Sequence, residues 1–458
     1  MLRKVQTGFL WLLLALPLAA GADIRVHEYR LANGLKLIVQ EDHRSPVVVS
    51  QVWYKVGSQD EVTGNTGLAH ALEHMMFKGT RAVPAGQFSK IIAAAGGREN
   101  AFTGHDYTAY FQQLEKSKLG LAFKLEADRM QNLQFSPTEF AKEIKVVMEE
   151  RRWRTEDKPQ ALVEEQLMAT AFQEHPYRRP VIGWMDDLEH MTVDDAAAWY
   201  RHWYAPNNAT LVVVGDVEPD AVLKLAQRWF GPVPARPLPV RKPMGEPEQK
   251  GIKRVNVKAP AELPYLLMGY HAPALQKPEQ DWEPYALEIL SGVLDGNASA
   301  RLNRTLVRER RIASEVGAGY DLIARGPSTF MVEGTPSEGK TVADLEAAIR
   351  EQLEKIKQEG ITAEELQRVK AQVIAAQVYQ RDSMFYQAMQ IGQLETVGLS
   401  YKTLEIRLAK LKAVTADQVQ AVARKYLTED NLTVATLDPQ PLTGRKPVAP
   451  PQEHLHGR

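Results

Sequence analysis

The sequence contains no cysteine, and its formal net charge is only −1 at pH 7 over 458 residues. Without cysteine the chain can form neither disulfides nor thiolate metal sites, so any metal must be held by His, Asp or Glu. The near-zero net charge provides no overall field that would attract nucleic acid, which is therefore not expected as a partner. Apolar and charged contents of 44% and 25% are ordinary for a globular protein.

Long apolar runs are also missing, except for one near the N-terminus. Arg3 and Lys4 precede an apolar run over residues 9–20, and the small residues at 20–22 (Ala-Gly-Ala) fit a cleavage site. We expect residues 1–22 to be a cleaved signal peptide, which makes the mature protein periplasmic or secreted, with no stable membrane span. An uncleaved membrane anchor is the alternative, although the run is short for a bilayer.

The length and an internal repeat indicate two domains. A chain of this length exceeds one ordinary core, and Ser136-Pro-Thr-Glu-Phe recurs as Thr362-Ala-Glu-Glu-Leu. Between the copies lies a stretch so dense in proline that it can neither continue a helix nor pair inside a sheet. Both copies mix strands and helices, which predicts an α+β fold. The predicted parts are a first domain over 23–230, a Pro-rich linker over 231–250, a homologous second domain over 251–438 and a disordered tail over 439–458.

A His-x-x-Glu-His motif, His70-Ala-Leu-Glu73-His74, lies inside a helix predicted over residues 66–78. Residues four apart lie one above the other on a helix, so His70 and His74 can face one metal ion, with Glu73 beside it. An exposed helix face with two unrelated histidines is the alternative. The many apolar neighbours of the motif indicate instead a buried helix, whose polar side chains need partners.

A second predicted helix offers the third ligand that a catalytic zinc site requires. Ser136 should cap its start, and Glu139 should close a capping box with Ser136. Glu143 and Glu150 lie seven residues apart and share a face, whereas Glu149 points about a quarter-turn away. We predict Glu150 as the ligand and Glu143 as the partner that orients a ligating histidine. The alternative for Glu143 is a surface acid.

The second copy of this helix carries neither acid. The positions that correspond to the two glutamates hold Val369 and Ala376, and that copy has no His-x-x-Glu-His motif. The acidic face is therefore not a requirement of the fold. This contrast between the copies favours a metal site in the first domain.

The predicted ligand set determines the expected chemistry. Zinc lowers the pKa of a bound water to about 7 and polarises a carbonyl. Glu73 would take the proton of that water and pass it to the leaving amine. We therefore predict a zinc metalloendopeptidase with one Zn²⁺ per chain that hydrolyses extended or unfolded peptides. Two alternatives remain, a non-catalytic peptide-binding or scaffold subunit and a different zinc hydrolase such as an amidase.

Three stretches resemble motifs of the pitrilysin, insulin-degrading enzyme and mitochondrial processing peptidase family, the inverzincins. They are residues 67–80 around the histidines, Asn100-Ala-Phe-Thr103, and residues 143–150. The resemblance implies two homologous domains per chain, each a mainly antiparallel sheet covered by helices, and a clamshell dimer around a chamber. It also implies that the strand with Asn100, Ala101 and Phe102 accepts the substrate peptide as an added β-strand.

One stretch departs from the family pattern. Active members often carry an Arg and a Tyr, seven residues apart, that contact substrate near the zinc. In this chain Val307 and Ser314 occupy those positions, and the register speaks against Arg308 or Tyr320 as substitutes. We therefore expect dimerisation with a related subunit that supplies the Arg/Tyr pair, or otherwise a homodimer.

Overall fold

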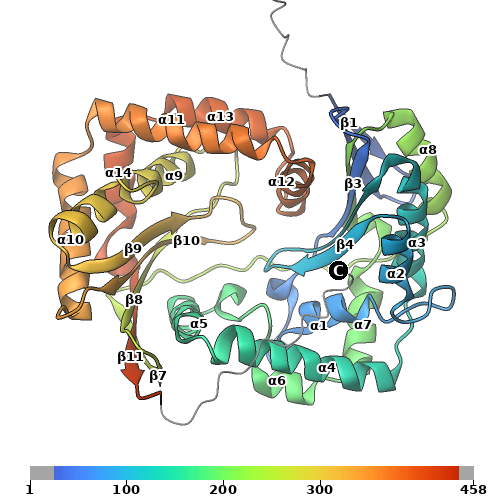
Figure 1. Cartoon of the computed structure of the whole chain (residues 1–458), viewed down its shortest axis with the longest axis horizontal. Helices are drawn as coiled ribbons and strands as arrows, with labels where there is room; N and C mark the ends of the chain where they lie inside the picture. The colour runs from blue at the N-terminus through green and yellow to red at the C-terminus, as the bar shows by residue number, and fades with distance from the viewer. Residues whose placement is uncertain (1–24, 443–458) are drawn as a thin grey trace, which may run out of the picture.

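The computed structural model describes residues 25–442 and shows two α+β domains (Figure 1). The signal peptide expected over 1–22 and most of the expected tail lie outside the described residues. No helix within the described part of the chain has the length and apolar character that a membrane crossing demands.

The first domain is built on a six-stranded sheet in which β2 and β6 are parallel and all other neighbouring strands are antiparallel. Its central strands β3 and β6 are rich in valine and buried along almost their whole length, as expected for strands with packing on both faces. In sheet order the strands are β1 (Val26–Arg30), β2 (Lys36–Glu41), β6 (Ala209–Gly215), β3 (Val47–Tyr54), β5 (Thr108–Glu115) and β4 (Arg98–Thr103). Strand β4 is therefore an edge.

Helices of the first domain pack around this sheet and share one apolar core with it. They are α1 (Leu68–Met75), α2 (Gln87–Ala94), α3 (Leu119–Asn132), α4 (Pro137–Arg151), α6 (Met185–His190), α7 (Val193–Trp203) and α8 (Pro219–Trp229). Helix α5 (Pro159–Ala171) belongs to the same part of the chain, but its apolar residues lie in other clusters. Helix α1 contacts β4, α4 and α7, which places it between the edge strand and the helical layer.

The second domain repeats this topology with five strands. Its order matches that of β2-β6-β3-β5-β4, and the parallel pair, β7 with β11, falls at the corresponding place. The strands are β7 (Lys253–Pro260), β11 (Leu432–Gln440), β8 (Tyr265–Ala272), β10 (Ser328–Pro336) and β9 (Ala313–Tyr320). The helices are α9 (Glu283–Leu294), α10 (Val342–Glu359), α11 (Ala363–Gln380), α12 (Met384–Thr396), α13 (Thr403–Ala413) and α14 (Ala416–Tyr426). The predicted α+β class with two similar, mainly antiparallel domains is confirmed.

One helix of each domain packs against the sheet of the other domain. Val163 and Leu167 of α5 pack against the second sheet, in a cluster with residues of β7, β8 and β11. Ala388 and Ile391 of α12 pack in the same way against the first sheet, where Trp53 is fully buried. The two domains are thus joined by exchanged apolar contacts as well as by the chain between them.

Three local expectations need correction or refinement. Residues 231–250 contain no helix or strand, but β11 runs through Pro439 and Gln440, so these two residues are not part of a disordered tail. The capping box at α4 is half formed. Ser136 Oγ accepts the amide of Glu139 (3.4 Å), but the Glu139 carboxylate binds Lys142 (2.8 Å) instead of returning to the cap. Helix α1 is also shorter than the predicted 66–78.

Candidate active site

The start of α1 is held by a buried carboxylate and a close glycine contact. Oε2 of Glu61 accepts the amide of Gly67 (2.9 Å), and Oε1 accepts the amide of Ala69 (2.8 Å), so Glu61 occupies the positive end of the helix. Burial raises the pKa of Glu61 to about 8, although both amides lower it. Gly67 has φ +83°, and a Cβ there would lie 2.9 Å from Cα of Gly183. These contacts fix where the motif helix begins.

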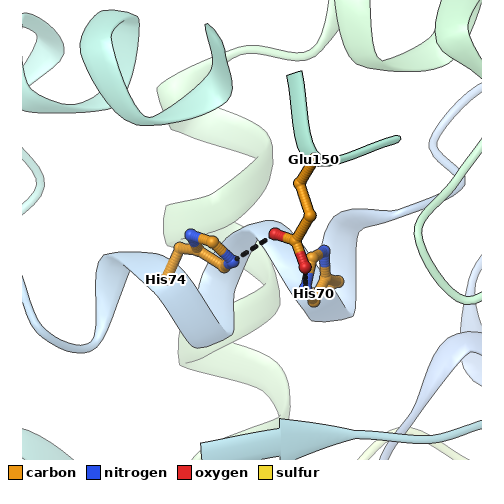
Figure 2. A group of neighbouring side chains, drawn as sticks. All are labelled: His70, His74 and Glu150. Atoms are coloured by element: carbon orange, nitrogen blue, oxygen red, sulfur yellow. Dashed lines mark ion pairs between the residues drawn. The ribbon is translucent and has the colours of Figure 1, made fainter. Parts of the chain in front are cut away.

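Three donor groups converge between α1 and α4 (Figure 2). Nε2 of His74 lies 3.3 Å from Oε2 of Glu150, and Nε2 of His70 lies 3.8 Å from Oε1 of the same carboxylate. The ligand atoms of all three residues lie within 4.8 Å of one another. Among residues 25–442 no other group of three His, Asp or Glu side chains converges in this way. The structure thus brings together the three residues that the sequence assigns to one metal.

The protonation tendencies of these residues suit a cation at the point of convergence. Burial lowers the pKa of His70 to about 3, which keeps its ring neutral. Burial also lowers the pKa of His74, but hydrogen bonds to Glu143 and Glu150 outweigh it and raise the value to about 9. Burial raises the pKa of Glu150, yet contact with His74 holds it at about 2. Neutral imidazole, carboxylate and a local preference for positive charge fit a His₂Glu zinc site.

Glu73 lines the same cavity but does not belong to the convergent group. Its side chain is 9% exposed, and Oε2 accepts a hydrogen bond from Oγ1 of Thr103 at the end of β4. Burial raises the pKa of Glu73 above its usual range, against the opposing effects of His74 and Thr103. A carboxyl group whose proton affinity is raised in this way suits a group that takes up and returns a proton.

Glu143 is buried and contacts His74 rather than solvent. Its Oε1 lies 2.9 Å from Nδ1 of His74, and its Oε2 lies 2.5 Å from Nζ of Lys78. This contact presents Nε2 of His74 to the convergent site, and it excludes the alternative of a surface acid for Glu143. Glu149, the competing candidate for third ligand, is exposed and pairs with Arg152.

A cavity of about 660 Å³ opens beside the convergent residues. Its wall includes Asn100, Ala101 and Phe102, because β4 is the edge of the first sheet. The amide of Ala101 donates to Oδ1 of Asn100 (2.9 Å), and the ring of Phe102 packs edge-on against Trp53, with centroids 5.3 Å apart. The three residues expected to bind substrate therefore lie on a strand edge in the wall of the cavity that holds the site.

Several polar residues at the site were not predicted from the sequence. They are Lys78, Thr103 and Arg154, whose Nη1 lies 2.8 Å from Oε1 of Glu150. Lys78 follows His74 by four residues, and Arg154 follows Glu150 by four, so helical spacing could have indicated both. Thr103 contacts Glu73 only because β4 lies beside α1, which no sequence spacing reveals.

The residues at the expected Arg and Tyr positions do not line this cavity. Val307 packs against the core of the second domain, and Oγ of Ser314 donates to the carbonyl of Thr335 (3.2 Å). The hydroxyl of Tyr320 donates to the carbonyl of Pro273. Within this chain, none of these three side chains reaches the cavity of the candidate site.

Comparison with known proteins agrees with this geometry. A family model described as insulinase (peptidase family M16) matches residues 36–184, and one described as peptidase M16 inactive domain matches residues 190–373. A zinc protease named PqqE from Helicobacter pylori is 34% identical over 339 residues, which cover 72% of this chain and 74% of that protein. The chain belongs to peptidase family M16. The name of that relative describes it as a zinc protease.

Solved structures extend the likeness to the fold. A protease from Helicobacter pylori superposes with a TM-score of 0.86 at 30% identity, over 91% of this chain and 100% of that chain. The periplasmic protease PqqL from Escherichia coli matches with a TM-score of 0.77 at 18% identity, over 91% of this chain but only 48% of its own. The present two-domain unit thus has the fold of about half of that longer protein.

The family models and the sheets divide the chain at different places. The models meet between residues 184 and 190, but β6 is hydrogen-bonded between β2 and β3 and so belongs to the first sheet. Hydrogen bonding defines the folded unit, and the structural boundary therefore lies after α8, in the proline-rich stretch.

Proposed function

We propose that this chain is a zinc-dependent endopeptidase that hydrolyses extended or unfolded peptides. The observation that carries the proposal is the convergence of His70, His74 and Glu150 at one point of a cavity, with Glu73 beside them and outside the ligand group. Three protein ligands that leave room for a further group are typical of catalytic rather than structural zinc.

Each residue of the site has a distinct task. Zinc held by His70, His74 and Glu150 would supply a Lewis acid for the reaction. The Glu73 carboxylate accepts the proton that the attacking water gives up, and it returns this proton to the nitrogen of the leaving amine. Glu143 fixes the ring of His74 through Nδ1. In this scheme one buried carboxyl group, that of Glu73, carries the proton from the water to the leaving amine.

The edge strand β4 accounts for the expected substrate class. An extended peptide can pair with the free edge of β4 through main-chain hydrogen bonds, which depend little on side-chain identity. A folded protein cannot offer such a strand without unfolding locally. Asn100, Ala101 and Phe102 are the residues that we propose for this pairing.

Exchange of Glu73 for Gln tests the proposal. In a peptide-cleavage assay, Glu73→Gln should retain one zinc per chain and lose roughly 10²- to 10⁴-fold in turnover, because only the proton acceptor is removed. Glu149→Gln, an exposed acid on the neighbouring helix, is the matched control and should cleave like the wild type.

The two alternatives give different results in the same assay. If the chain were a scaffold subunit, the wild type and Glu73→Gln would bind peptides equally well, and neither protein would cleave them. An amidase would leave peptides intact and hydrolyse a small amide instead. Either result would contradict the proposed endopeptidase.

A second subunit completes the proposal. The fold of this chain corresponds to about half of a longer structural neighbour, and Val307 and Ser314 stand where an Arg and a Tyr are expected. We propose a clamshell dimer with a related subunit that supplies the Arg/Tyr pair. Light scattering of the chain alone and co-expressed with a related subunit, combined with cleavage rates, tests this. Full activity of the monomeric chain would contradict it.

The N-terminal sequence supports export. We propose that residues 1–22 are removed and that the mature protein acts in the periplasm or outside the cell. N-terminal sequencing of protein recovered from the periplasmic fraction should read from Asp23. An intact N-terminus on a membrane-bound protein would favour the anchor instead.

A further inference from the structure

A continuous series of ionisable side chains runs through the metal-ligand group. Lys78 contacts Glu143, Glu143 contacts His74, His74 contacts Glu150, and Glu150 contacts Arg154. A cation stands at each end of this series, four residues after a proposed ligand. Lys78 lies just beyond the end of α1, and Arg154 lies in the turn that continues α4. Outside the group of three ligands, His74 contacts Glu143, and Glu150 contacts Arg154.

Arg154 reaches the ligand group from an unusual turn. Helix α4 continues directly into η3 (Arg152–Glu156), a π-helical turn, which is rare and often marks functional sites. Nη1 of Arg154 lies 2.8 Å from Oε1 of Glu150, and Arg154 lines the cavity of the site. The side chain of Arg154 is 53% exposed, whereas that of Glu150 is 13% exposed. A half-exposed arginine thus meets an almost buried ligand.

The two oxygens of Glu150 have separate neighbours. Oε2 faces Nε2 of His74 at 3.3 Å, while Oε1 is bound by Arg154 at 2.8 Å and lies 3.8 Å from Nε2 of His70. Arg154 therefore holds the oxygen that is turned away from His74. A guanidinium on Oε1 fixes the rotation of the carboxylate, so that Oε2 stays directed at His74 and Oε1 stays on the side of His70.

We infer that Arg154 is a positioning residue, which holds the Glu150 carboxylate in the orientation that binds the metal. The inference rests on the proposed zinc site, and it assigns to Glu150 the same kind of support that Glu143 gives to His74. Nδ1 of His70 has no such partner among residues 25–442. Two of the three ligands are thus held from outside, and Arg154 is one of the two supports.

The alternative is competition, in which Arg154 occupies the carboxylate in place of the metal. Competition and positioning predict opposite changes when the guanidinium is removed. Loss of a competitor, or simple loss of a positive charge, strengthens cation binding. Loss of a positioning contact weakens it, typically by about 10- to 100-fold for groups that orient a metal ligand.

Zinc affinity of the full chain decides between these two roles. We would measure it by competition with a chromogenic chelator for the wild type, Arg154→Gln, Arg154→Lys and Arg152→Gln. Arg152 lies two residues away, is partly exposed and pairs with Glu149, so its exchange removes the same charge without touching the ligand group. We expect about 10- to 100-fold weaker binding for Arg154→Gln, partial recovery for Arg154→Lys and unchanged or slightly tighter binding for Arg152→Gln.

Cobalt substitution gives a readout that overall stability does not affect. The visible absorption bands of bound Co²⁺ report coordination geometry, and we expect them to change in Arg154→Gln and to match the wild type in Arg152→Gln. Wild-type affinity and spectrum in Arg154→Gln, or tighter binding, would overturn the inference while leaving the zinc site intact. A wild-type chain that binds neither ion would overturn the proposed function as well, so the two failures are distinguishable.

Discussion

Oγ1 of Thr103, at the end of edge strand β4, donates a hydrogen bond to Oε2 of Glu73 on helix α1. This contact joins the strand proposed to bind substrate to the residue proposed to move the proton. A peptide that pairs with β4 therefore lies on the element that also orients the base.

Thr103→Val should lower turnover while leaving the metal in place. The exchange keeps the shape of the side chain and removes only the hydroxyl, and hydrogen bonds to charged groups contribute about 1.5–3 kcal/mol. We expect kcat to fall by roughly 10- to 100-fold, with zinc content and melting temperature near those of the wild type. Thr436→Val, which removes a hydroxyl bound to Asn256 in the second domain, is the control. Equal kcat values for the two variants would show that the Thr103 hydroxyl does not contribute to turnover.

Removal of zinc should lower the melting temperature. The site gathers the carboxylates of Glu73, Glu143 and Glu150 in a buried region, and a bound cation stabilises the folded state that holds them. A ligand at a thousand times its Kd contributes about 4 kcal/mol. Calorimetry with and without chelator should show the loss, and added zinc should restore it. The variant His70→Ala should no longer respond, and a chelator-insensitive wild type would count against the metal site.

Glu99 should make stability depend on pH. It is 6% exposed, and burial raises its pKa from 4.5 to about 7, against the opposing contact with Ser89. Between these values the folded state keeps a proton that the unfolded state has lost, so the free energy of unfolding falls as pH rises. Glu99→Gln should therefore be more stable than the wild type by up to roughly 3 kcal/mol at pH 8, and by almost nothing near pH 4.

Urea unfolding across this pH range measures the Glu99 effect. The exposed Glu338→Gln is the control, and its difference from the wild type should stay small at every pH. A constant gain for Glu99→Gln from pH 4 to pH 8 would show that the carboxyl does not titrate between these limits.

Gly392→Ala should weaken the contact between α12 and the first sheet. A Cβ at Gly392 would lie 2.1 Å from the ring of Trp53, which is fully buried, so either the ring or the helix would have to shift. Overpacking of this kind costs about 1–3 kcal/mol or more. Gly120→Ala in α3 is the control, since its Cβ meets only Leu225 at 3.5 Å and should stabilise the helix. Equal stability of the two variants in urea would show that α12 can shift away.

Much of the fold follows from local patterns. The repeat of Ser136 at Thr362 reflects two helices that are each capped by a hydroxyl side chain, and both begin where the sequence predicts. The strand order and the exchange of α5 and α12 could not be predicted, because they depend on which apolar faces pack together between parts of the chain that are far apart in sequence.

The site shows the same division. Helical spacing alone places His70 above His74 and aligns Glu143 with Glu150, because 3.6 residues per turn bring these pairs to one face. Their convergence at one point required α1 and α4 to pack against each other. The contact of Thr103 arises from an edge strand beside α1, which leaves no periodic signal. Helical spacing brings Arg154 near Glu150, but it does not reveal the π-helical turn on which Arg154 lies.

Spacing along a helix is a property of the backbone, so the sequence by itself determined which side chains share a face and where the helices of the motif lie. Because the sequence has no cysteine, it also determined that any metal must be bound by nitrogen and oxygen. Distances between elements are set by packing. Only the tertiary structure decided that two helix faces meet, that β4 is an edge strand beside the proton acceptor, and that Arg154 binds the oxygen of Glu150 that does not face His74.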